Sequence, residues 1–338
     1  MLSPWQLGIA RPSAGIYERI CVALRGTCTE QASDTRMRMR FMPTRRVGRL
    51  SLCSLSWKLV QSGCHSTCST TLRRSQMLGA AEVQYLVTNK EYMDEFQGAA
   101  VDAIALEDII RAGENNHAEV PLERVTPSDA AFIMFTSGST DVPNGIVQTH
   151  GVLLGKVQGI ANHVKLCPAS RIFQSASFSF EVSMGDIFCA FYAGSVLCVP
   201  SEEQRLNHLE YAMQTMRVTH AFLTPSTALQ ISPAVVQSLQ FLMLGGEKLP
   251  ASLVEVWATR VVLCNIYRTS ETCIWDTIKV GVNNDTEVGK IGFSLGPILQ
   301  IVDPENLRVI TGSEISGELL IGGHSLAAGH LASTGAKD

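Results

Sequence analysis

Short apolar runs alternate with segments of helical period through the middle of this chain. Residues 130–135 form a continuous apolar run, which is typical of a strand buried on both faces. Four apolar residues at helical spacing then predict the buried face of a helix: Leu153, Val157, Ile160 and Val164. Further strands are expected at 195–200, 221–224, 241–244 and 261–266, with helices at 208–216 and 253–259. This alternation predicts a layered α/β fold between about 81 and 285, with parallel or mixed strands.

The two ends of the chain differ from this middle. Residues 1–80 contain twelve Arg or Lys and three Asp or Glu, whereas the whole chain has a net charge of −4. This basic leader shows no sustained period, and we expect it to be disordered or poorly packed. Residues 81–338 form the predicted domain, in which turns at Gly296-Pro297 and Asp303-Pro304 predict a small β-rich part from about 288.

Composition argues against several classes of function. A net charge of −4 gives no reason to expect nucleic acid or an acidic membrane surface as a partner. The longest apolar stretch, 187–199, has 13 residues, while a membrane span needs about 20. The ten cysteines show no paired zinc spacing and no framework that demands an oxidising compartment. We therefore expect a cytoplasmic protein.

A loop rich in hydroxyls and glycines follows the apolar run at 130–135. Its side chains and backbone amides suit an anion such as a triphosphate, and its glycines allow the amides to turn inward. It is not a P-loop, because no Lys and Ser or Thr follow its second glycine. An ordinary polar surface loop is the alternative for such a string alone. The candidate binding residues are Thr136, Ser137, Gly138, Ser139, Thr140 and Gly145.

Four motifs occur in order along the chain, at 136–145, 245–247, 265–271 and 317–331. The first resembles the pattern T-S-G-S/T-T-G-x-P-K-G, the third resembles N-x-Y-G-P-T-E, and the last resembles G-E-L-x-I-x-G-x-x-L-A-R-G-Y-L. Together they make the chain similar to the adenylate-forming, or AMP-binding, superfamily. The resemblance implies the layered α/β/α subdomains of the N-terminal domain of these enzymes, which a mobile C-terminal domain follows in the family.

The resemblance implies ATP and Mg²⁺ as cofactors. Ser270 and Glu271 correspond to catalytic positions, with Glu271 as the Mg²⁺ ligand. The second and third motifs would supply further ATP-binding residues: Gly245, Gly246, Glu247, Asn265 and Tyr267. The chain departs from the family patterns at Asp141 for Gly, Asn144 for Lys, and Arg268-Thr269 for Gly-Pro. The first two changes should weaken ATP binding, because one adds a carboxylate near phosphate and the other removes a cation.

Residues 180–183 favour the amino-acid adenylation domains of nonribosomal peptide synthetases. Those domains carry F-D-x-S, whose Asp pairs with the substrate α-ammonium; Glu181 stands in that place, and Asp186 is a second candidate. The resemblance maps the side-chain pocket onto Val182, Gly185, Leu223, Met243, Gly245, Ile266, Ile274 and Trp275. Because these residues are apolar, it implies a hydrophobic amino acid, of undetermined size, as substrate. It also implies a partner carrier domain bearing phosphopantetheine, which this chain does not contain.

The family pattern continues past Leu331 to a Y-x-T-G-D motif and a C-terminal domain with a Lys, and neither occurs in this chain. We therefore expect a truncated adenylation domain with weak or no activity alone. Three alternatives stay open: a non-catalytic nucleotide- or partner-binding module, a non-functional gene fragment and, within the superfamily, an acyl-CoA or aryl-acid ligase. Glu181 argues against the last, because a neutral residue would suit a substrate without an ammonium.

Overall fold

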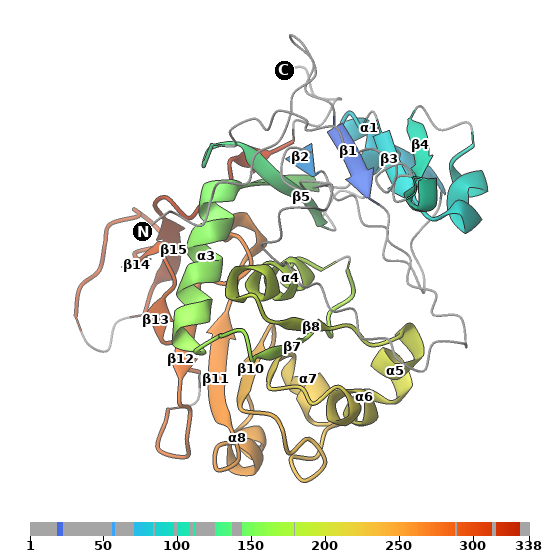
Figure 1. Ribbon diagram of the computed structural model, residues 1–338. Coiled ribbons are helices and arrows are strands. Elements are labelled where there is room, and N and C mark those ends of the chain that lie inside the picture. Colours follow the sequence, from blue (N-terminus) through green and yellow to red (C-terminus); the bar gives the residue numbers. More distant parts are fainter. Residues whose placement is uncertain are drawn as a thin grey trace, which may run out of the picture. The chain divides into compact units, whose positions relative to one another are not determined.

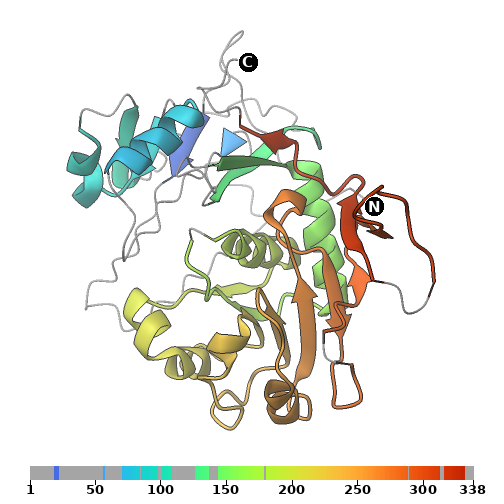
Figure 2. The ribbon, with the colours of Figure 1, turned by 180° about the vertical axis from the view of Figure 1, so that it is seen from behind.

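The structure is a computed structural model that describes residues 19–22, 56–57, 71–83, 85–97, 101–108, 111, 126–136, 144–178, 180–287, 289–312 and 316–331. The chain divides into two compact units, whose elements are shown in Figures 1 and 2. Among the described residues, those from Val152 to Leu326 form the larger unit. Those up to Gly151, together with 327–331, form the smaller unit.

A seven-stranded sheet runs through the larger unit in the order β13-β12-β11-β10-β9-β7-β8. Its strands are β7 (Arg171–Phe173), β8 (Val196–Cys198), β9 (His220–Leu223), β10 (Phe241–Gly245), β11 (Val262–Tyr267), β12 (Thr277–Val280) and β13 (Phe293–Ser294). Strands β11, β10, β9, β7 and β8 are parallel to one another. Strands β12 and β13 extend the sheet beyond β11 in the antiparallel sense. Parallel strands are covered on both faces, so every residue of β10 is buried.

Helices cover both faces of this sheet. They are α3 (His150–His163), α4 (Val182–Ala193), α6 (Leu209–Thr215), α7 (Pro225–Ala228) and α8 (Ala251–Trp257), while the short α5 (Glu202–Asn207) buries none of its residues. On one face, α6, α7 and α8 pack around a core that includes Leu223, Leu242 and Leu263. On the other face, Nε2 of His220 lies 2.9 Å from the carbonyl oxygen of Val164, which directly follows α3. Figures 1 and 2 show α3 and α4 on this second side, so the expected layered α/β fold is confirmed.

Most elements expected from periodicity are present within a few residues of their predicted bounds. Strands β8, β9, β10 and β11 and helices α6 and α8 are confirmed, and the predicted apolar face of α3 is buried. Helix α5 was not expected, although Ser201 and Gln204 form a capping box at its start. No helix in the described part of the chain is long and apolar enough to cross a membrane.

The stretch after residue 288 divides among three sheets. Strand β13 joins the main sheet beside β12, while β14 (Ile298–Val302) and β15 (Glu318–Gly322) form a separate antiparallel pair. Strand β16 (Gly329–His330) pairs with β6 (Asn144–Thr149) in the smaller unit. Of the β-rich part expected from about 288, the described residues therefore form one two-stranded sheet and contribute edges to two others.

The smaller unit contains two sheets. Strands β1 (Arg19–Val22), β2 (Ser56–Trp57), β3 (Tyr85–Thr88) and β4 (Asp102–Ala105) form a parallel sheet in the order β2-β1-β3-β4. Strand β6 lies between β16 and β5 (Ala130–Thr136) in an antiparallel sheet. Helix α1 (Thr71–Ala80) precedes β3, and the 3-10 helix η1 (Lys90–Phe96) follows β3. Met77 and Leu78 of α1 pack in one apolar cluster with Leu86 and Ile133.

Two features of the smaller unit differ from the sequence expectation. Residues 71–80 were expected in the poorly packed leader, but α1 buries Met77 and Leu78; most of residues 1–70 lie outside the described residues. The loop after β5 was expected to lead directly into a helix, but β6 returns antiparallel to β5 before α3 begins at His150. The apolar part of β6 is only Ile146 and Val147, which is too short for periodicity to reveal a strand.

Candidate active site

Several predicted site residues lie at the carboxyl ends of parallel strands in the larger unit. Gly245 is the last residue of β10, and Tyr267 is the last residue of β11. Glu181 follows β7 by a short connection and stands directly before α4. Open parallel sheets bind ligands in this position, beyond the carboxyl ends of their strands. The fold therefore gathers motifs that are up to ninety residues apart at one edge of the sheet.

The segment at 245–247 is held close to its neighbours. A Cβ atom at Gly245 would lie 2.6 Å from the backbone oxygen of Ile266, so only glycine fits between β10 and β11. Gly246 has a φ of +86°, which side chains rarely adopt. Glu247 is exposed; its carboxylate accepts hydrogen bonds from the backbone N–H of Ser226, at 3.0 Å, and from the Ser226 hydroxyl. These bonds lower the pKa of Glu247 and tie the segments after β9 and β10 together.

Asn265 is placed differently from the other residues of its motif. Its side-chain amide donates to the carbonyl of Lys290 at 2.9 Å, and the residue is 7% exposed. It also lines a small cavity with Leu249 and Val282, both of which belong to the core under α8. The structure thus gives the Asn265 side chain a hydrogen-bond partner within the fold.

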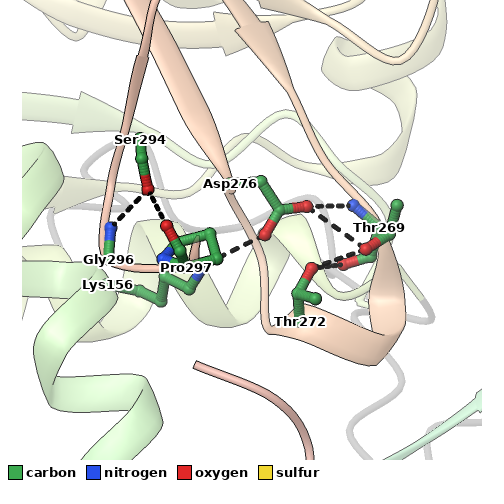
Figure 3. Close-up of polar contacts among 7 residues, drawn as sticks. All are labelled: Lys156, Thr269, Thr272, Asp276, Ser294, Gly296 and Pro297. Atoms are coloured by element: carbon green, nitrogen blue, oxygen red, sulfur yellow. Dashed lines mark hydrogen bonds and ion pairs between the residues drawn. The ribbon is translucent and has the colours of Figure 1, made fainter. Parts of the chain in front are cut away.

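The turn that follows Tyr267 is held by side-chain hydrogen bonds, shown in Figure 3. The Thr269 hydroxyl lies 2.5 Å from the Thr272 hydroxyl, and the Thr269 backbone N–H donates to Oδ2 of Asp276 at 2.8 Å. The 3-10 helix η2 (Ser270–Thr272) within this turn carries Ser270 and Glu271. Glu271 is exposed, so its carboxylate can reach a ligand.

A buried ion pair lies behind this turn. Nζ of Lys156 on α3 is 3.0 Å from Oδ1 of Asp276, and the two side chains are 1% and 0% exposed. Burial lowers the pKa of Lys156, and the charge of Asp276 acts in the opposite direction. Neither residue was predicted as part of the site. One signal could have found Lys156, because it lies three residues after Leu153 on the otherwise apolar face of α3.

Glu181 is buried, with an exposed fraction of 2%. Burial raises its pKa from 4.5 to about 8, while a hydrogen bond from the Ile274 backbone, the charge of Arg268 and the Ser270 side chain lower it. Glu181 therefore lies beside the turn that carries the third motif. Asp186, the second candidate, is also buried, and burial raises its pKa well above the usual range.

Trp275 and Ile274 pack against Gly185 on α4. A Cβ atom at Gly185 would lie 2.4 Å from Cη2 of Trp275 and 2.8 Å from Cγ2 of Ile274. Trp275 also contacts Phe222, with ring centroids 5.7 Å apart, and is 2% exposed. The space that a glycine leaves at position 185 is thus filled by the Trp275 ring.

The structure separates Leu223 from the other predicted pocket residues. Leu223 packs in the core around α6, α7 and α8, while its neighbour Phe222 points to the opposite face and meets Trp275. Met243 pairs in register with Phe222, and Ile266 with Gly245, while Val182 is buried at the start of α4. Sequence reasoning missed Phe222 by one position, because the alternation of a short buried strand does not show which face each residue takes.

The hydroxyl-rich loop belongs to the smaller unit. Thr136 ends β5 and pairs with Asn144, and Phe135 pairs with Gly145 at the start of β6. The loop is therefore the connection of a β-hairpin. Ser137, Gly138, Ser139 and Thr140 lie outside the described residues, as does Asp141. The last motif returns to the same strand, where the Leu331 N–H donates to the Gly145 carbonyl at 2.7 Å.

Comparison with known proteins agrees with this geometry. Residues 65–331 match the family described as AMP-binding enzyme. Nonribosomal peptide synthetase gloA of Glarea lozoyensis is 35% identical over 259 residues, which are 77% of this chain but only 4% of that protein. This chain therefore spans a small part of the relative's length.

Solved structures share the fold at low sequence identity. The N-terminal subdomain of Klebsiella oxytoca NpsA, in complex with 3-hydroxybenzoyl-AMSN, has a TM-score of 0.68 at 19% identity, covering 83% of this chain and 71% of that chain. O-succinylbenzoate coenzyme A synthetase (MenE) from Bacillus subtilis, in complex with ATP and magnesium ion, has a TM-score of 0.73 at 17% identity, covering 93% of this chain and 62% of that chain. With the family match over most of its length and its motifs at the strand ends, the chain belongs to the AMP-binding enzyme family.

Proposed function

We propose that this chain activates an amino acid with ATP as an aminoacyl-adenylate in nonribosomal peptide synthesis. The observation that carries the proposal is the position of Glu181, a buried carboxylate beside the turn with Ser270 and Glu271. A carboxylate buried beside a nucleotide turn suits a substrate that brings its own positive charge. The relative in Glarea lozoyensis, a nonribosomal peptide synthetase, supports the same class of reaction.

The nucleotide would be held by the residues at the ends of β10 and β11. Tyr267 and Ser270 are half-buried and Glu271 is exposed, so this turn carries an aromatic ring, a hydroxyl and a carboxylate. Mg²⁺ needs only one or two protein carboxylates when phosphates and water complete its ligands, so Glu271 fits this ion. Among the described residues, no three acidic, His or Cys side chains cluster as a metal site of their own.

The α-ammonium of the substrate would pair with Glu181. The pKa of about 8 means that this carboxyl is largely protonated at neutral pH in the free protein. An ammonium within hydrogen-bonding distance favours the ionised carboxylate, so binding should release a proton. A substrate without an amino group gains nothing from this residue, which is why an acyl-CoA or aryl-acid ligase is the less favoured alternative.

The substrate side chain would be small and apolar. The pocket residues that the structure brings together are apolar, and Trp275 fills the space beside Gly185. A large side chain would have to displace the indole ring, which also packs on Phe222. Glycine or alanine therefore fits this wall better than phenylalanine does.

The proposal is tested with nonhydrolysable aminoacyl-sulfamoyl adenosines in calorimetric titrations with Mg²⁺. The alanyl compound should bind at least about tenfold more tightly than the phenylalanyl compound, and Trp275→Ala should narrow that difference. Glu181→Ala should lower the affinity for the alanyl compound about 10- to 100-fold, since this substitution removes the buried carboxylate that would pair with the ammonium. The matched control is the propionyl compound, which lacks the amino group and should bind the wild type and Glu181→Ala with equal affinity.

Turnover should be weak even if the alanyl compound binds tightly. Asn144 replaces a cation of the family pattern, and Asp141 adds a carboxylate to the loop, so pyrophosphate exchange is expected to be weak or undetectable. Binding of the alanyl compound without exchange is thus compatible with a weakly active domain and also with a non-catalytic nucleotide-binding module. Restoring Gly at 141 and Lys at 144 should tighten ATP binding. A carrier domain bearing phosphopantetheine is the proposed partner that accepts the amino acid.

A further inference from the structure

The loop Thr269–Asp276 carries groups for both halves of the proposed chemistry. Glu271 is exposed and is the predicted Mg²⁺ ligand, while the Ile274 backbone and the Ser270 side chain form hydrogen bonds with Glu181. Cys273 and Ile274 are consecutive non-glycine residues with φ of +66° and +60°. Such backbone is strained for residues with a side chain and persists only where other contacts hold it in place. The loop therefore depends on contacts that fix its two ends.

The side chain and backbone of Asp276 close this loop on itself. Oδ2 of Asp276 accepts hydrogen bonds from the Thr269 backbone N–H at 2.8 Å and from the Thr269 hydroxyl at 3.2 Å. The Asp276 N–H donates to the Tyr267 carbonyl at 3.0 Å. One residue thus joins the last position of the loop to its first position.

Lys156 fixes the same carboxylate from α3, as Figure 3 shows. Its ammonium binds Oδ1 of Asp276, so the two carboxylate oxygens serve different partners. Burying two charges carries a large desolvation penalty, and an apolar pair of similar volume is often equally stable or more stable. Global stability alone therefore does not explain why the chain buries Lys156 and Asp276 here.

The sequence of the turn gives a reason for burying this ion pair. The adenylate-forming pattern has Gly-Pro where this chain has Arg268-Thr269. Proline fixes its own φ but has no N–H, whereas Thr269 has an N–H and a φ of −132°, which proline cannot adopt. The hydrogen bond from Thr269 to Asp276 is therefore available only because proline is absent, and it restrains the turn that proline would have restrained.

We propose that Lys156 and Asp276 are positioning residues of the adenylation site. The hydrogen bonds from Thr269 to Asp276, whose buried charge Lys156 balances, hold the loop Thr269–Asp276 so that Glu271 faces the nucleotide, while Ser270 and Ile274 face Glu181. The proposal rests on the proposed function for its ligands, although the effect on the loop itself is independent of any ligand. Small displacements of positioning groups can cost about 100-fold in activity, so the contribution should be measurable.

Two double variants separate positioning from burial of charge. Lys156→Met with Asp276→Asn removes both charges but keeps an oxygen that accepts from Thr269, whereas Lys156→Met with Asp276→Leu keeps no acceptor. Lys156→Met alone leaves a buried carboxylate without its cation. Lys290→Met is the matched control, because Lys290 forms an exposed ion pair with Glu287 at 3.1 Å. Near-ultraviolet circular dichroism verifies that each variant is folded.

Hydrogen exchange of the native protein is the first readout. In the Leu double variant, the Thr269 and Ile274 amides should exchange at least about tenfold faster, while the amides of β10 and β11 keep their protection. The second readout is the affinity for alanyl-sulfamoyl adenosine, which should fall at least about tenfold in the Leu double variant and less than about threefold in the Asn double variant. Lys156→Met alone should resemble the Leu double variant, and Lys290→Met should resemble the wild type.

The outcomes distinguish this inference from the proposed function. If the wild type binds no adenylate compound, the proposed function is wrong, and hydrogen exchange still decides whether the pair holds the loop. The inference is overturned if the Leu double variant keeps both wild-type exchange and wild-type affinity, or if the two double variants are equally impaired. If the Leu double variant does not fold, the comparison of Lys156→Met with the Asn double variant decides, because only the former should lose loop protection.

Discussion

Glu181 stands directly before α4 with its carboxyl buried, although hydropathy alone would predict a solvated Glu at this position. Burial raises its pKa to about 8 against the combined effect of the Ile274 backbone, Arg268 and Ser270. The folded protein therefore keeps a proton on this carboxyl that the unfolded chain releases near pH 4.5. A single buried group thus links stability, proton release and the proposed recognition of an ammonium.

We predict that the free energy of unfolding falls as pH rises from about 5 to about 8, because the folded state binds a proton that the unfolded state has lost. For a carboxyl with a raised pKa, this stabilisation is complete below 4.5 and is lost as the pH approaches 8. Glu181→Gln should reduce the slope of the free energy of unfolding against pH by up to about 1.4 kcal/mol per pH unit. Urea unfolding at several pH values measures the slope.

Glu255→Gln is the control for this measurement, because Glu255 is exposed on α8. Part of the slope should remain in Glu181→Gln, since burial also raises the pKa of Asp186. An identical slope in wild type and Glu181→Gln would contradict the assignment.

Individual elements owe their bounds to local chemistry as well as to packing. Helix α5 is short and buries none of its residues, so packing does little to define it. Its start is fixed by the capping box, in which the Gln204 N–H donates to Oγ of Ser201 at 3.2 Å and the Ser201 N–H donates to Oε1 of Gln204 at 3.0 Å. Apolar periodicity cannot find such a helix, whereas the spacing of Ser and Gln can.

Ser201→Ala should therefore destabilise the larger unit by about 1 kcal/mol, because it removes the acceptor for one end of the helix. Ser201→Asp should be close to neutral, since aspartate caps equally well. Ser252→Ala, on the exposed face of α8, is the control. Equal unfolding midpoints for Ser201→Ala and Ser252→Ala would show that the cap contributes nothing.

At the scale of the whole molecule, the motifs fall into different units. The hydroxyl-rich loop connects β5 and β6 in the smaller unit, while the residues at the strand ends, Glu181 and the Lys156–Asp276 pair belong to the larger unit. The larger unit also contains five cysteines whose thiols are free. Cys189, Cys198, Cys264 and Cys273 are buried in it, and Cys167 is exposed.

These thiols report on how the larger unit unfolds. A hydrogen bond from the Ser170 side chain lowers the pKa of the exposed Cys167, which should react rapidly with a thiol reagent in the native protein. Burial raises the pKa of the four buried thiols, which should react only after the unit opens. Mass spectrometry of labelled peptides at increasing urea should show the four becoming reactive together. Separate transitions would contradict cooperative unfolding of this unit.

Much of the fold follows from local sequence. Strands β8 to β11 are short apolar runs, and α3 repeats its apolar residues at helical spacing, so their existence and type are predictable. Strand β6 and helix α5 were missed, because each has too few apolar residues to show a period. The placing of Glu181, Tyr267 and Glu271 near strand ends was also predictable, since motif residues that follow parallel strands meet at one edge of the sheet.

The sequence by itself determined the alternation of buried strands and helices, the order of the motifs and the chemical types of the residues at the strand ends. Only the tertiary structure decided that Phe222 and not Leu223 meets Trp275, because the face that a strand residue takes depends on what packs against the sheet. It also decided that Lys156 binds Asp276, 120 residues further along the chain. Local patterns carry no information about such a contact, since it exists only when a helix and a loop are brought together across the folded core.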